Sequence, residues 1–107
     1  MYCTVKYMDF NSAFSNIVEF EWDEGNLEHI KKHIVEDSEC EQVFTNKPLI
    51  ILGDEKHSVY EERFKIFGKS DEGRYLALVV TVRENKIRVV MARDQNKKER
   101  GDLKNVK

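Results

Sequence analysis

The stretch that decides the fold lies in the middle of the chain and reads His57-Ser58-Val59-Tyr60-Glu61-Glu62-Arg63-Phe64-Lys65-Ile66-Phe67-Gly68. From Tyr60 to Phe67 the side chains alternate in a way that is typical of a strand with one buried face. One face would carry Tyr60, Glu62, Phe64 and Ile66, and the other would carry Glu61, Arg63, Lys65 and Phe67. The strand would therefore hold an arginine opposite its apolar side chains.

Two more strands and a helix follow toward the C-terminus. Residues 68–73 predict a hairpin loop, because glycines flank a run of polar side chains. Tyr75 to Val82 is almost continuously apolar, which indicates a central strand buried on both faces. Ile87 to Ala92 would be the last strand. Asn96 can then cap a final helix, rich in lysine and arginine, that ends at about Leu103.

The N-terminal half predicts a strand, two helices and a further strand. Val18 to Trp22 alternates as a strand does, and Asp23 can cap a helix that runs to about His33. The buried side chains of this helix would be Leu27, Ile30 and Ile34. A second helix would span Glu36 to Thr45, and Leu49 to Leu52 would be a short strand. The second helix would bury Cys40, Val43 and Phe44.

The order β-α-α-β-β-β-β-α predicts an α+β fold. Strands joined by short turns favour a mainly antiparallel sheet, of four to five strands, with the helices packed on one face. In the order of the chain, two helices would come near the N-terminal end, after the first strand, and one helix would come at the C-terminal end. A chain of 107 residues is the size of one domain, which we expect at residues 17–107. Residues 1–16 show no clean periodicity and would be an N-terminal extension.

The composition is that of a globular protein with an uneven distribution of charge. Residues 1–62 carry 14 acidic and 5 basic side chains, whereas residues 83–107 carry 4 acidic and 9 basic. A basic C-terminal part is compatible with nucleic-acid binding, although a charged run can equally be a solvated surface. The two cysteines have no zinc-ligand spacing, and no apolar stretch approaches the roughly 20 residues of a membrane helix. We therefore expect a cytoplasmic protein without a membrane partner.

Arginines on or beside strands are the features that point to chemistry. A guanidinium group matches the oxygens of a phosphate with two parallel hydrogen bonds, so a phosphate backbone would explain Arg63, Arg88 and Arg93. Strict alternation raises a difficulty, because Arg88 and Arg93 are five residues apart and should point to opposite faces. They can converge only if Arg93 lies at the end of its strand or if a β-bulge intervenes.

An ordered set of short motifs runs from about Phe20 to Arg100: Phe20-Glu21-Trp22-Asp23, Asn26, Lys32-His33, Val43-Phe44, Asp54, His57-Ser58, Glu61-Glu62-Arg63, Gly68, Arg88, Ala92-Arg93 and Glu99-Arg100. In this order and spacing the set resembles the BrnT family of bacterial type II toxins, which have a RelE-like ribonuclease fold. The resemblance implies an endoribonuclease that arrests translation. It also implies a BrnA-type antitoxin as partner, which binds operator DNA, so that the toxin would contact that DNA only indirectly.

The sequence offers candidates for each step of metal-free RNA cleavage, which needs a base, an acid and positive charge around the phosphate. The candidate catalytic residues are Arg63, Arg88, Arg93, Glu62, His33 and Lys32. The candidate RNA-binding residues are Lys97, Lys98, Arg100 and Trp22. No zinc-ligand cluster, phosphate-binding glycine loop or nucleophile motif is visible, so we expect no metal and no cofactor.

Structural explanations stand beside these functional ones. His33 would suit the C-terminal end of a helix whatever its function, and Trp22 could be a packing residue. Glu61 and Glu62 could form salt bridges with lysines across the sheet. At the level of the whole protein, two alternatives stay open: a non-catalytic protein that only binds its antitoxin or operator complex, and a structural RNA-binding domain.

Overall fold

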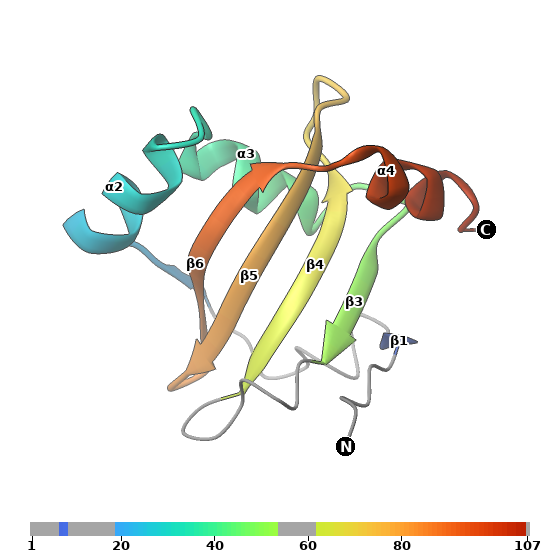
Figure 1. Ribbon diagram of the computed structural model, residues 1–107. Coiled ribbons are helices and arrows are strands. Elements are labelled where there is room, and N and C mark those ends of the chain that lie inside the picture. Colours follow the sequence, from blue (N-terminus) through green and yellow to red (C-terminus); the bar gives the residue numbers. More distant parts are fainter. Residues whose placement is uncertain (1–6, 9–18, 54–61, 107) are drawn as a thin grey trace, which may run out of the picture.

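The computed structural model describes residues 7–8, 19–53 and 62–106 of the chain. Its elements follow the predicted order, with one short strand added at the N-terminal end (Figure 1). They are β1 (Tyr7–Met8), β2 (Glu19–Glu21), α2 (Glu24–Lys31), α3 (Asp37–Val43), β3 (Ile50–Gly53), β4 (Arg63–Lys69), β5 (Tyr75–Arg83), β6 (Lys86–Asp94) and α4 (Lys97–Lys104).

The strands form one mixed sheet in the order β1-β3-β4-β5-β6-β2. Neighbouring strands are antiparallel except β2, which pairs with β6 in parallel at one edge of the sheet. The long hairpins β4–β5 and β5–β6 form the centre, with β3 beside β4. The prediction of an α+β fold with a mainly antiparallel sheet is therefore confirmed.

The main core lies between the sheet and the two helices α2 and α3. Ile30 and Val43 of these helices are buried in one cluster with inward-facing side chains of the central strands, such as Ile66, Leu78 and Val89. Cys40 and Phe44 belong to the same cluster, as the sequence predicted. Gly68 permits the close packing of α3 on β4, because a Cβ atom at this glycine would lie 2.7 Å from Cγ1 of Val43.

Helix α4 packs on the opposite face of the sheet, so the prediction that all helices share one face is wrong. Figure 1 shows α4 in front of the sheet near the upper ends of β3 and β4, with α3 behind the strands and α2 to the left of β6. Leu103 of α4 is fully buried, and Ile50 and Ala77 are buried outside the main core. A second, smaller apolar contact thus holds α4, and it covers only part of this face.

The predicted capping residues begin their helices as expected. Asp23 caps α2 in a reciprocal capping box with Asn26, and Asn96 caps α4 in the same way with Glu99. The end of α2 differs from the prediction, because the helix stops at Lys31 and Ile34 adopts a left-handed φ of 56°. Ile34 is consequently 83% exposed rather than buried, and Val35 enters the core in its place.

Two strands end later than predicted. β4 continues to Lys69 and β6 to Asp94, so residues that were expected in loops belong to the sheet. The buried side chain of Gln95 secures this end of the sheet, since its Nε2 donates to the carbonyl oxygens of Gly68 and Leu76. Arg93 therefore lies within the β5–β6 ladder, opposite Ala77, rather than at a free strand end.

Candidate functional site

A β-bulge in β6 settles the orientation of its two arginines. In the pairing of β5 with β6, Val79 lies opposite Met91 and Val80 lies opposite Val89, so Val90 is an extra residue without a partner in the ladder. The extra residue resets the alternation of side chains along β6. Arg88 and Arg93 consequently point to the same face of the sheet, although they are five residues apart.

Three cross-strand rows make up this face, each with one residue from β4, β5 and β6. The rows are Arg63–Thr81–Arg88, Lys65–Val79–Met91 and Phe67–Ala77–Arg93. At a rise of about 3.3 Å per residue, neighbouring rows are roughly 7 Å apart. We call the surface formed by Arg63, Lys65, Thr81, Arg88, Met91 and Arg93 the basic face. It faces away from α2 and α3 and is bounded at one end by α4.

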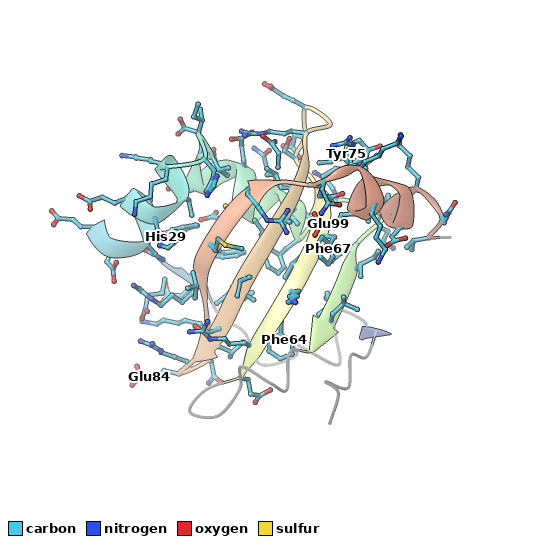
Figure 2. All side chains as sticks on the ribbon, in the orientation of Figure 1. His29, Phe64, Phe67, Tyr75, Glu84 and Glu99 are labelled. Atoms are coloured by element: carbon cyan, nitrogen blue, oxygen red, sulfur yellow. The ribbon has the colours of Figure 1, made fainter. Side chains whose placement is uncertain are left out.

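Arg93 is joined to the first turn of α4. Its Nη1 and Nη2 donate to Oε1 and Oε2 of Glu99 at 2.7 and 2.9 Å, which is a two-pronged ion pair. Oε1 of Glu99 also accepts from the backbone N–H of Asn96. Figure 2 shows Glu99 where α4 meets the sheet. The same carboxylate thus fixes the Arg93 side chain and the beginning of the helix.

The charges around Glu99 define the upper end of the basic face. The hydrogen bond from Arg93 is the main reason that the pKa of Glu99 is lowered, and the nearby positive charge of Lys65 contributes as well. The pKa of Arg93 is raised in turn by Glu99. Lys65 is itself exposed in the middle of β4. Glu99 therefore remains ionised at neutral pH between two cations.

Arg88 occupies the other end of the basic face and is tied to the edge of the sheet. Its Nη1 lies 2.6 Å from Oδ2 of Asp23 and 3.2 Å from Oε1 of Glu21, and its Nη2 donates to Oδ1 of Asp23. The hydrogen bond from Arg88 is the main reason that the pKa of Asp23 falls to about 2. Arg88 therefore links β6 to β2 and to the N-terminal cap of α2.

Of the six predicted catalytic residues, the structure places Arg63, Arg88 and Arg93 on the basic face. The other three lie elsewhere or beside it. Lys32 and His33 are exposed just after α2, on the helix side of the sheet. Glu62 is exposed directly before β4, next to Arg63 in the chain. The motif residues Asp54, His57, Ser58 and Glu61 lie outside the described residues.

The four predicted RNA-binding residues also divide between the two sides. Trp22 packs against the main core, and its Nε1 donates to Oε2 of Glu41 on α3 at 2.8 Å. Lys97 and Lys98 are exposed in the first turn of α4. Arg100 is half-buried and donates from Nη1 to the carbonyl oxygen of Gln95. The α4 residues thus adjoin the basic face, whereas Trp22 lies on the helix side.

Four residues with prominent contacts or positions were missed by the sequence analysis as site candidates: Lys65, Arg74, Thr81 and Glu99. Arg74 joins three segments, because it bonds Asp94, Glu39 and the carbonyl oxygens of His33 and Ile34. The alternation from Arg63 placed Lys65 on the correct face. The polar Thr81 within an apolar strand, and Glu99 three residues after a capping Asn96, were the available signals for the other two.

The two sides of the sheet differ in charge. Residues 24–44, which include α2 and α3, carry six acidic and two basic side chains, in contrast to the four cations of the basic face. Within the described ranges, His, Cys, Asp and Glu side chains form no group of three or more that could hold a metal ion. In the same ranges, none of the helices is long and apolar enough to cross a membrane.

Comparison with known protein families identifies a match. A family model described as "Ribonuclease toxin, BrnT, of type II toxin-antitoxin system" matches residues 22–99. The matched segment begins just before the cap of α2, includes the whole of β3 to β6, and ends in the first turn of α4 at Glu99. A search of curated proteins found no match.

Proposed function

The chain belongs to the BrnT family of ribonuclease toxins of type II toxin-antitoxin systems, and we propose that it cleaves RNA on its basic face without a metal ion. The observation that carries the proposal is the convergence of Arg63, Lys65, Arg88 and Arg93 on one side of the sheet. Four cations on one face favour contact with the negatively charged backbone of RNA.

The proposed reaction is attack of a ribose 2′-hydroxyl on the adjacent phosphate. A base removes the hydroxyl proton, an acid protonates the departing 5′-oxygen, and cations stabilise the charge that grows on the phosphate. Arg63 and Arg93 lie two rows apart on the basic face and would bind different phosphates of the RNA backbone. Lys65, on the row between theirs, would donate to the departing oxygen. Glu62 lies just outside β4, and its exposed carboxylate would turn toward this face to accept the proton.

Arg88 and Glu99 would act in part through their neighbours. Arg88 holds the edge of the face in place through Asp23 and Glu21, while its guanidinium remains on the same row as Arg63. Glu99 keeps Arg93 oriented through its two hydrogen bonds. Lys97, Lys98 and Arg100 would extend the contact with the RNA backbone along α4.

The partner of a type II toxin is a protein antitoxin, and we propose that the antitoxin of this chain is of the BrnA type. It would block the basic face and would connect the toxin to operator DNA. RNA cleavage by the free toxin would inhibit translation. Residues 17–107 would form the toxin domain, with residues 1–16 as an extension.

Induced expression in a bacterial host tests this function. We would compare the parent chain with Arg63→Ala and follow growth and total RNA together. The proposal predicts growth arrest and RNA degradation for the parent and relief of both by the substitution, with equal amounts of folded protein. Normal growth with both soluble proteins would contradict it and would favour a non-catalytic protein that only binds its antitoxin.

A further inference from the structure

Thr81 carries a buried hydroxyl group in β5, a strand whose other side chains are apolar or aromatic except the exposed Arg83 at its end. Its side chain is 0% exposed, and within the described part of the chain its Oγ1 has no hydrogen-bond partner. A buried polar group without a partner destabilises the folded state, and such groups are rare in native proteins. Valine has nearly the same shape and would fill the position without this cost. The hydroxyl therefore calls for an explanation other than packing.

The neighbours of Thr81 indicate what could bind there. It lies opposite Arg63 of β4 on one side and opposite Arg88 of β6 on the other, so the hydroxyl is placed between two arginines on the basic face. Residues directly opposite each other in antiparallel strands have Cβ atoms about 5 Å apart. A small group lying over Thr81 would consequently be within reach of both guanidinium groups.

The carboxylates that already bind Arg88 lie on its far side from Thr81. Glu21 belongs to β2, beyond β6, and Asp23 follows it at the cap of α2. Within the described residues, the bonds from Arg88 to these carboxylates use Nη1 and Nη2. The Nε–H of Arg88 makes no bond to these two carboxylates. A ligand over Thr81 would thus meet Arg88 without displacing its structural partners.

We propose that Arg63, Thr81 and Arg88 form a binding subsite for one phosphate group of the RNA, about two rows along the sheet from Arg93. This inference rests on the proposed function, because it assigns a contact to the RNA that the basic face would bind. The Thr81 hydroxyl donates to a phosphate oxygen and the arginines neutralise its charge. Since the hydroxyl is fully covered in the free protein, the groups that cover it move aside when the phosphate enters.

The substitution Thr81→Val tests the subsite, with Thr81→Ser as the matched variant that keeps the hydroxyl. Two quantities would be measured: kcat/KM for cleavage of a single-stranded RNA, and Kd for a 2′-deoxy oligonucleotide of the same sequence, which retains the phosphates but lacks the attacking hydroxyl. Thermal unfolding of all three proteins would be recorded in parallel.

For Thr81→Val, the subsite predicts a loss of about tenfold or more in both quantities, as for one hydrogen bond to a charged group. Its Tm should equal or exceed that of the parent, and Thr81→Ser should bind as the parent does. Parent-like cleavage and binding by Thr81→Val would overturn the inference, and so would a lower Tm, which would reveal a structural partner for the hydroxyl. If the parent does not cleave RNA, the proposed function fails, and the binding measurement alone decides the subsite.

Discussion

Arg88 and Arg93 lie on the same face of the sheet although five residues separate them in β6, because the bulge at Val90 shifts the alternation between them. Without the bulge, one of the two would have to enter the apolar core beside Val89 and Ala92. The extra residue therefore does two things at once. It keeps both arginines out of the core, and it aligns them with Arg63 and Lys65 of β4.

Removing one cation from the basic face should weaken RNA binding irrespective of sequence. We expect Lys65→Ala to lower the affinity for a single-stranded oligonucleotide and to reduce the slope of log K against log salt by about 0.7, the value for one contact to a single strand. Binding titrations at several salt concentrations measure both quantities. Lys31→Ala, which removes an exposed lysine from α2 on the helix side, is the control and should leave the slope unchanged.

Changing Glu99 to glutamine should separate binding from cleavage. A glutamine can still cap α4, so the helix is retained while the ion pair with Arg93 is lost. We expect Glu99→Gln to bind RNA several-fold more tightly, because a negative charge leaves the face, and to cleave it more slowly, because Arg93 is less well oriented. We would measure Kd for the RNA and the cleavage rate at saturating RNA. A cleavage rate equal to that of the parent would argue against an orienting role for Glu99.

Arg74 should matter for stability and not for RNA. Its side chain bonds Asp94, Glu39 and the carbonyl oxygen of Ile34 at 2.8, 3.1 and 2.7 Å, which joins the β4–β5 hairpin to α3 and to the end of β6. The Asp94 carboxylate is largely exposed, so the pair with it contributes little. We expect Arg74→Ala to lower the free energy of unfolding by about 1–2 kcal/mol, measured by urea denaturation.

Lys98→Ala is the control for Arg74→Ala, since it removes an exposed positive charge from the surface of α4. It should alter the free energy of unfolding by less than about 0.5 kcal/mol. Arg74→Ala should also leave cleavage per folded molecule unchanged. A specific loss of cleavage at parent-like stability would instead assign Arg74 to the site.

Acid should destabilise the fold through three paired carboxylates. Arg88 lowers the pKa of Asp23 to about 2, and the pKa values of Asp94 and Glu99 are lowered by Arg74 and Arg93 respectively. A carboxyl whose pKa is lowered by folding binds its proton more weakly in the folded chain than in the unfolded chain. Protonation therefore favours unfolding, and stability should be greatest above about pH 5 and fall as the pH drops toward 2.

The substitution Asp23→Asn tests that pH dependence. It removes one of the three groups while an asparagine can still cap α2. Thermal unfolding followed from pH 7 to about pH 3 should show a smaller fall in Tm for Asp23→Asn than for the parent. Parallel curves for the two proteins would mean that the Asp23–Arg88 pair contributes nothing to acid sensitivity.

Local signals in the sequence predicted most of the elements. The capping residues Asp23 and Asn96 act within one turn of their own helix, and the alternation around Arg63 depends only on the pleat of β4. The resemblance to the BrnT family rested on motifs in the same segments, and the family match confirms it. These features are readable because each is decided by residues close together in the chain.

Features that depend on distant partners were not readable in the same way. The bulge at Val90 exists only in the pairing of β6 with β5. From the sequence, alternation showed only that Arg88 and Arg93 could share a face if a bulge or a strand end came between them. The placement of α4 depends on how Leu103 meets the sheet, and Ile34 leaves the core because the chain turns there in a left-handed conformation. The contacts of Glu99 and the burial of Thr81 follow from the same packing, so neither residue stood out as a site candidate.

Cleavage of a single-stranded RNA by the purified chain, in the presence of a chelator, tests metal-free catalysis on the basic face. We expect products that end in a 2′,3′-cyclic phosphate, loss of cleavage in Arg93→Ala, and full cleavage in the control Lys31→Ala, with all three proteins equally folded. Cleavage by Arg93→Ala at the parent rate, or no cleavage by the parent until a divalent metal is added, would contradict it.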